Sequence, residues 1–177
     1  CAPSSTHVFF KIMEERQSVT LLDQTGDDLG TRMAQVFENL FSRGHKHVLI
    51  VGTDVPSLPL EQYAQVLTLL GSHDLVLGPA LDGGYYLIAL NRPVPDLFTG
   101  IPWSTDQVLK LTQEKASALG LKSALLAPWR DVDTIDDLQA LVEASTLDAK
   151  KPKRDQSFSS RTAGALQLLA KRLRSRA

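Results

Sequence analysis

The feature that most constrains the fold is an uninterrupted apolar run, HVLIVG, at His47–Gly52. The run is too short for a helix and lacks polar alternation, so it predicts a strand buried on both faces. Strands of this kind are typical of parallel sheets, because the connections between parallel strands place helices over both faces. We therefore expect an α/β fold with helices on both sides of a sheet.

Helical and strand patterns alternate along the rest of the chain. Apolar residues recur at helical spacing from Met33 to Phe41, and Gly44 follows as a stop signal. This alternation predicts a three-layer α/β/α arrangement around a mixed, mainly parallel sheet. The other expected elements are strands at Val19–Leu22, Leu75–Leu77, Tyr85–Leu90 and Ser123–Ala127, and helices from Pro59 to Gly71, from a Ser104–Gln107 capping box to Gly120, and from a Thr134–Asp137 cap onward.

The formal net charge of −1 conceals a strong asymmetry along the 177 residues. Residues 150–177 hold nine Lys and Arg and one acid, whereas the preceding residues hold ten Lys and Arg and nineteen acids. We expect a globular domain over 1–144 and a basic tail over 145–177, made of a linker and a short amphipathic helix at Thr162–Arg176. The tail is either solvated or a contact for an anionic membrane or a nucleic acid.

Composition excludes several classes of protein. Cys1 is the only cysteine, so no intramolecular disulfide framework is possible. No apolar run in the sequence approaches the roughly 18 residues of a membrane-spanning helix. A hydrophobic content of 43% excludes wholesale disorder, and we expect a cytoplasmic protein.

Acidic residues follow two of the expected strands. Asp54 comes directly after HVLIVG, and Asp131 and Asp133 lie between the last strand and the last helix. Ligands of open parallel sheets bind at the carboxyl ends of strands, and carboxylates gathered there repel unless a proton or a cation intervenes. Mg²⁺ prefers such oxygen ligands. The alternative is that Asp54 caps a loop while Asp131 and Asp133 cap the last helix.

A glycine turn and a tryptophan complete the candidate site. The turn Asp82–Tyr85 (DGGY) lets a ligand approach the backbone without meeting a Cβ, although a tight hairpin explains the same residues. Trp103, next to Ser104 at an expected helix start, either stacks on a substrate ring or anchors a loop.

Five motifs occur together in one order, and together they carry a resemblance. The chain resembles a bacterial family of GT-A-type glycosyltransferases, called radical-SAM/selenodomain-associated transferase 1 and classed as a domain of unknown function. It is more distantly similar to the MobA and CofC nucleotidyltransferases. The resemblance covers residues 1–143 and rests on GDDLGTRM, GTDVPSL, GPALDGGYYLIAL, LFTGIPWST and RDVDTIDDL.

This resemblance implies a nucleotide-diphospho-sugar transferase fold and roles for particular residues. Asp54 and Asp133 match the two metal-binding acids, for Mg²⁺ or Mn²⁺. Gly83 and Gly84 match the sugar or acceptor side of the cleft. The implied catalytic residues are Asp54, Asp82 and Asp133, and the implied substrate-binding residues are Thr53, Gly83, Gly84, Tyr85, Trp103 and Ser104.

The implied activity is Mg²⁺-dependent transfer of a sugar from a nucleotide diphosphate to a small-molecule acceptor. One alternative is nucleotidyl transfer from a nucleoside triphosphate to a phosphorylated acceptor. Family members begin with a strand and a nucleotide-binding loop that nothing here matches, so we expect the domain over 1–144 to lack its first strand. A non-catalytic remnant that acts as a binding module is therefore the other alternative.

Overall fold

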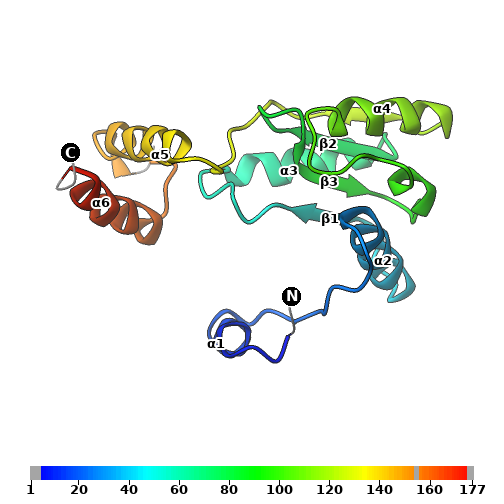
Figure 1. The fold of residues 1–177 in the computed structure, drawn as a ribbon, viewed down its shortest axis with the longest axis horizontal. Helices are drawn as coiled ribbons and strands as arrows, with labels where there is room; N and C mark the ends of the chain where they lie inside the picture. Colours follow the sequence, from blue (N-terminus) through cyan, green and yellow to red (C-terminus); the bar gives the residue numbers. More distant parts are fainter. Residues whose placement is uncertain (1–4, 154–155, 175–177) are drawn as a thin grey trace.

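The computed structural model describes residues 5–153 and 156–174 of the chain. Its sheet has four strands in the order β1-β3-β2-β4: β1 (Val48–Val51), β2 (Leu75–Pro79), β3 (Tyr85–Leu90) and β4 (Ser123–Leu125). β3 is antiparallel to both β1 and β2, and β2 is parallel to β4. β3 lies between β1 and β2 (Figure 1) and runs against them, whereas β1, β2 and β4 point the same way. The predicted mixed sheet is confirmed, with two antiparallel pairings and one parallel pairing.

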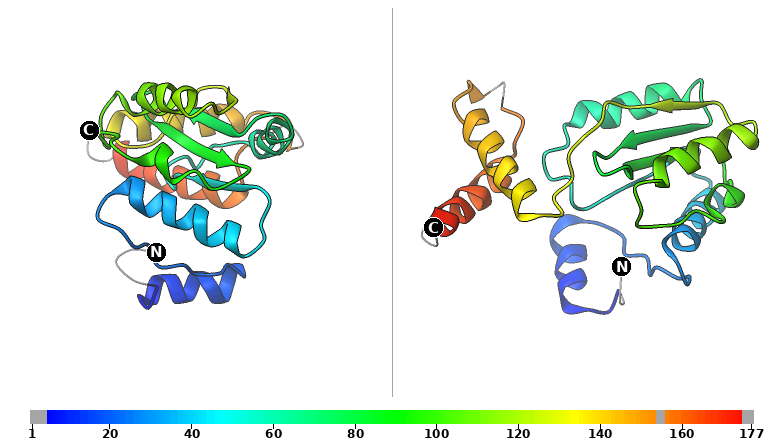
Figure 2. Two further views of the ribbon diagram at one scale, coloured as in Figure 1. Left: turned by 90° about the vertical axis from the view of Figure 1, so that its right-hand side faces the viewer. Right: turned by 45° about the horizontal axis from the view of Figure 1, so that its top comes forward.

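Helices cover both faces of this sheet, as the three-layer prediction requires. α2 (Leu29–Ser42), α4 (Val108–Ala118) and the short 3-10 helix η1 (Pro95–Phe98) contribute to one core, and α3 (Leu60–Leu70) contributes to the other. In Figure 2, α3 and α4 lie on opposite sides of the strands. The strands supply the two cores alternately, because successive side chains of a strand point to opposite faces. Leu75 and Leu77 of β2 pack in the first core, and Val76 packs in the second.

Side-chain caps explain where two of the helices begin. The Asp28 carboxylate accepts a hydrogen bond from the Thr31 backbone N–H at the start of α2. Thr134 and Asp137 form the reciprocal capping box of α5 (Ile135–Asp148), as their spacing predicts. Each cap satisfies backbone N–H groups that the first turn of a helix leaves without partners.

Two predictions of local structure are wrong. The expected strand at Val19–Leu22 is irregular, and no described strand pairs with it; a strand forms only where an edge accepts its backbone. The helix expected to begin at a Ser104–Gln107 capping box begins instead at Val108, without a side-chain cap. Ser104 has a φ of +64°, so the chain turns once more before the helix starts.

Strand β1 is less buried than the sequence predicts, because it lies at the edge of the described sheet. Val48 is buried, but the rest of β1 is half-buried, because within the described residues only β3 pairs with β1. Helix α1 (Val8–Gln17) lies apart from the sheet at the end of an irregular segment (Figure 1). Its Phe9 is 56% exposed, so α1 adds little to either core.

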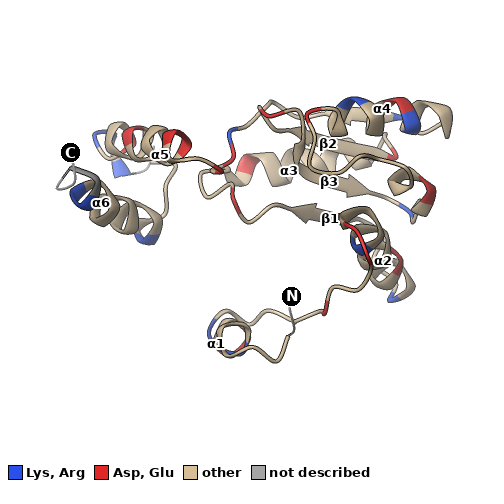
Figure 3. Ribbon diagram, in the orientation of Figure 1, with Lys and Arg blue, Asp and Glu red and all other residues tan. Residues whose placement is uncertain are grey.

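Helices α5 and α6 (Ser160–Arg174) form a hairpin that extends away from the sheet (Figures 1 and 2). The amphipathic helix predicted at 162–176 is thus present; its last two residues lie outside the described part of the chain. Leu166 is buried where α6 packs on α5, and the expected domain division at residue 145 falls inside α5. Lys and Arg residues occur along α6, and Asp and Glu residues along α5 (Figure 3).

Asp148 organises the connection between these two helices. It is only 4% exposed, and its Oδ2 accepts hydrogen bonds from the backbone N–H groups of Ser157 (2.8 Å) and Phe158 (3.0 Å). The Lys151 ammonium lies 3.0 Å from Oδ1. The Phe158 N–H, with Lys151 and the Ser157 N–H, lowers the pKa of Asp148 to about 2.

In the described residues, no helix is both long and apolar enough to cross a membrane.

We predict that the α5–α6 hairpin loosens in acid. An Asp pKa is about 3.9 in an unfolded chain. The depressed folded pKa of Asp148, about 2, therefore stabilises the hairpin above about pH 4, and this contribution is lost as the pH falls toward 2. Hydrogen-exchange protection of the α6 amides should fall over this range. Asp148→Asn should lower protection at pH 7 and remove the pH dependence, whereas exposed Glu143→Gln should leave both unchanged. Equal behaviour of the two variants would refute the role of Asp148.

Candidate functional site

A cavity of about 550 Å³ opens at the end of the sheet where β1, β2 and β4 finish. Because these strands point the same way, the loops that follow them lie at the same end of the sheet, the carboxyl end of the three strands. Five carboxylates line the cavity and none of its lining residues is Lys or Arg. The carboxylates are those of Asp54, Asp82, Asp106, Asp131 and Asp133.

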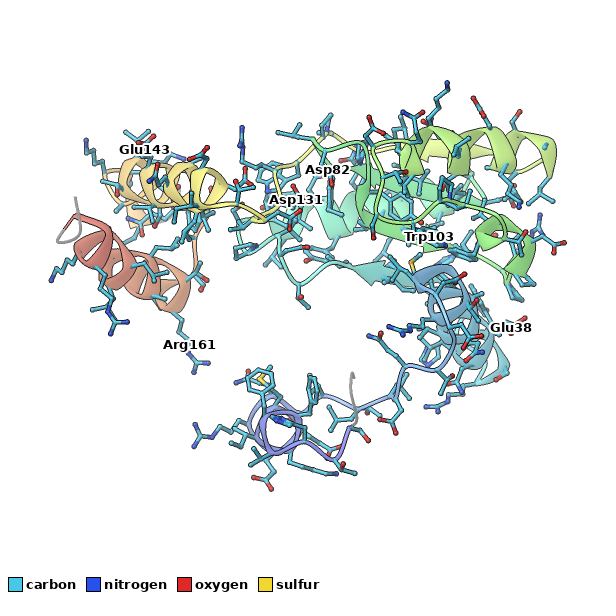
Figure 4. The ribbon with its side chains drawn as sticks, in the orientation of Figure 1. Glu38, Asp82, Trp103, Asp131, Glu143 and Arg161 are labelled. Atoms are coloured by element: carbon cyan, nitrogen blue, oxygen red, sulfur yellow. The ribbon has the colours of Figure 1, made fainter. Side chains whose placement is uncertain are left out.

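Three of these carboxylates form a close group. Oxygen atoms of Asp82, Asp131 and Asp133 all lie within 4.8 Å of one another, and Figure 4 shows Asp82 and Asp131 side by side. Burial raises the pKa of Asp131, and the neighbouring charges of Asp82, Asp133 and Asp54 raise it further. The fold thus holds negative charges together at an electrostatic cost that a bound cation would relieve.

The guanidinium next to this group in sequence does not neutralise it. Arg130 immediately precedes Asp131, but its Nη1 lies 2.7 Å from Oδ1 of Asp137 in the first turn of α5. Thr134 and Arg130 together lower the pKa of Asp137 to about 2. The positive charge of Arg130 is therefore engaged at the helix cap, and the cavity keeps its negative charge.

The glycine turn between β2 and β3 places Asp82 in the cavity wall. Gly84 N–H donates to Asp82 Oδ1 (2.9 Å), and Ala80 N–H donates to the Gly84 carbonyl (3.1 Å). Gly83 has a φ of +92°, and a Cβ there would overlap the backbone of Asp106. The Gly83 carbonyl accepts from the Leu109 N–H at 2.9 Å, so the turn packs directly against the start of α4.

Trp103 and Tyr85 provide the apolar side of the cavity. The Trp103 indole packs on Gly30 of α2, where an added Cβ would lie 2.6 Å from two of its atoms. Trp103 is therefore a loop anchor, and it also lines the cavity (Figure 4). The Tyr85 hydroxyl is buried near Thr112, and burial raises its pKa, so this residue offers its ring to the cavity rather than a proton.

Comparison with known proteins agrees with this architecture. The family described as "uncharacterized protein conserved in bacteria (DUF2064)" matches residues 2–105. The chain belongs to the DUF2064 family. A crystal structure of a Desulfovibrio desulfuricans G20 protein, described as a "putative nucleotide-diphospho-sugar transferase", superimposes with a TM-score of 0.81. The two sequences are 32% identical, and the match covers 97% of this chain and 72% of that one. No curated protein matches the chain.

Most residues of the predicted site lie around one cavity in this DUF2064 chain. The cavity is lined by seven of them: Asp54, Asp82, Gly84, Tyr85, Trp103, Ser104 and Asp133. Thr53 and Gly83 do not line it, although Gly83 shapes the turn beside it. The roles assigned to these residues stay predictions.

Six residues of the cavity wall are not in the predicted site: Leu29, Ala80, Thr105, Asp106, Val108 and Asp131. Asp131 has a signal in the alternation of the DVD motif, which places it on the same side as Asp133. Leu29 and Asp106 carry no comparable signal, because they reach the cavity only through the packing of α2 and α4 beside the glycine turn.

We predict that the glycine turn tolerates no side chain at position 83. Gly83→Ala should cost about 1–2 kcal/mol for a positive φ and about 2 kcal/mol more for displacing the Asp106 backbone. The matched control is Gly100→Ala, since Gly100 also has a positive φ (+70°) but nothing within 4 Å of an added Cβ. Urea unfolding measures both variants. Equal losses of unfolding free energy would show that the close approach to Asp106 is unimportant.

Proposed function

We propose that this DUF2064 chain is a nucleotide-sugar transferase that works with a bound divalent cation, Mg²⁺ or Mn²⁺. The observation that carries the proposal is the acidic cavity at the carboxyl ends of three strands, with three carboxylates within 4.8 Å of one another. The structural likeness to a protein described as a nucleotide-diphospho-sugar transferase supports the same conclusion.

The residues present fit a divalent cation. The acidic group, which consists of the carboxylates of Asp82, Asp131 and Asp133, offers oxygen atoms, and these are the ligands that Mg²⁺ and Mn²⁺ prefer. Burial raises the pKa of Asp131, and the neighbouring charges of Asp82, Asp133 and Asp54 raise it further, so a cation bound there would favour the ionised carboxylates. Asp82, Asp131 and Asp133 would hold the cation. Asp54, the predicted partner of Asp133 in the metal site, lines the same cavity but is not one of these three carboxylates. When bound, the cation supplies positive charge that stabilises a diphosphate leaving group.

The residues of the chain divide the remaining work between binding and proton transfer. Trp103 and Tyr85 offer aromatic surface to a sugar or base ring. Asp82, oriented by the Gly84 N–H, accepts hydrogen bonds from hydroxyl groups. In sugar transfer, an acceptor oxygen forms a bond to the sugar C1 atom while the bond from C1 to the diphosphate breaks. The acceptor's proton passes to a base, and the wall carboxylates are the candidate bases.

The reaction class is tested by identifying the product that leaves with the cation. Sugar transfer releases a nucleoside diphosphate, whereas nucleotidyl transfer from a triphosphate releases pyrophosphate. The protein is incubated with Mg²⁺ and panels of nucleotide sugars, or of nucleoside triphosphates with sugar phosphates. We expect nucleoside diphosphate from the first panel. Pyrophosphate from the second would establish nucleotidyl transfer, and turnover in neither panel would favour a binding module.

We predict that the acidic group binds Mn²⁺ measurably. Asp133→Asn removes one charge and one strong ligand, so Mn²⁺ affinity measured by electron paramagnetic resonance should fall at least about tenfold. The matched control is Asp136→Asn, because Asp136 is exposed in the first turn of α5 and does not line the cavity. An equal change in both variants would mean that Mn²⁺ senses overall charge and that the cavity holds no specific site.

A further inference from the structure

The two acidic loops of the cavity follow strands at opposite edges of the sheet. We call residues 52–57, after β1, the first acidic loop, and residues 126–134, between β4 and α5, the second acidic loop. In the order β1-β3-β2-β4, two other strands separate β1 from β4. Pairing within the sheet therefore holds the ends of β1 and β4 apart, and contacts outside the sheet must bring Asp54 toward the second acidic loop.

Two hydrogen bonds connect the acidic loops directly. The Val132 N–H, between the two acids of the second loop, donates to the Asp54 carbonyl at 3.0 Å. The indole Nε1–H of Trp129 donates to Ser57 Oγ, also at 3.0 Å. The first of these bonds joins two backbone groups, so it does not depend on which side chains stand at positions 54 and 132. The second requires an indole N–H at position 129 and a hydroxyl at position 57.

Trp129 is itself held firmly against the sheet. Its backbone N–H donates to the Pro79 carbonyl at the end of β2 (3.0 Å), which continues the parallel pairing of β2 with β4. Its side chain is half-buried and packs beside the second core, on the side of α3. The Tyr86 hydroxyl donates to the Ala127 carbonyl at 3.1 Å and supports the same loop from β3. These contacts fix the position of the Trp129 indole, which extends to the first acidic loop.

We propose that Trp129 and Ser57 are positioning residues that hold the first acidic loop against the second, so that the Asp54 carboxylate adds its charge to a cation site formed by Asp82, Asp131 and Asp133; this inference rests on the proposed function. Neither residue lines the cavity, so neither belongs to the ligand set. The charges of Asp54, Asp82 and Asp133 all act on Asp131, and their mutual repulsion favours separation of the loops. The hydrogen bond between Trp129 and Ser57 opposes that separation before any cation binds.

The test compares Mn²⁺ affinity in variants that remove only this hydrogen bond. Ser57→Ala removes the acceptor, and Trp129→Phe removes the donor but keeps an aromatic ring. Each should weaken Mn²⁺ binding about fivefold, the effect of losing one typical hydrogen bond. The double variant should bind Mn²⁺ as weakly as either single variant, because only one bond is lost. Ser57→Thr keeps the hydroxyl and should restore wild-type affinity.

A matched control separates positioning from general stability. Ser72→Ala removes another hydroxyl, which bonds the Leu69 carbonyl at the end of α3, and should leave Mn²⁺ affinity unchanged. Urea unfolding is measured for every variant. If Ser57→Ala and Trp129→Phe lower the free energy of unfolding but keep wild-type Mn²⁺ affinity, the pair is structural and the inference is overturned. If the wild-type protein itself fails to bind Mn²⁺, the proposed function falls first, and the two failures are distinguishable.

Discussion

The structure depends on β3, the strand that runs against its neighbours. It pairs with β1 on one side and with β2 on the other, and it is buried along almost its whole length. Its side chains alternate between the two cores, so Ile88 and Leu90 contact one helical layer while Leu87 and Ala89 contact the other. Removing β3 would separate β1 from β2 and open both cores together.

The reversal of β3 also explains the position of the site. A reversed strand needs only a short connection from β2, and the glycine turn Asp82–Gly84 provides it. That connection lies at the same end of the sheet as the loops after β1 and β4, so it places Asp82 beside the carboxylates of those loops. The same turn packs on the start of α4 through Gly83, which brings Asp106 and Val108 into the wall. One local reversal thus supplies both the central pairing of the sheet and part of its cavity.

Periodic patterns predicted most of the elements, and the failures have a common cause. The buried strands and amphipathic helices of the sheet domain were predictable because burial imposes a period of two or 3.6 on the side chains. Val19–Leu22 has the composition of a strand but lacks a described pairing edge. Ser104 has the spacing of a capping box, but the chain there makes a left-handed turn against neighbouring segments. Composition alone carries no information about either circumstance.

The sequence by itself determined the α/β class, the strand-end positions of Asp54, Asp131 and Asp133, and the turn that carries Asp82. These follow from local rules: hydrophobic period, glycine punctuation and the direction of parallel strands. Only the tertiary structure decided that the acids from opposite edges of the sheet share one cavity and that Trp129 reaches Ser57. Trp129 and Ser57 are 72 positions apart. The bridge of Trp129 to the end of β2 and its packing beside the second core place it within hydrogen-bond distance of Ser57, which no local pattern encodes.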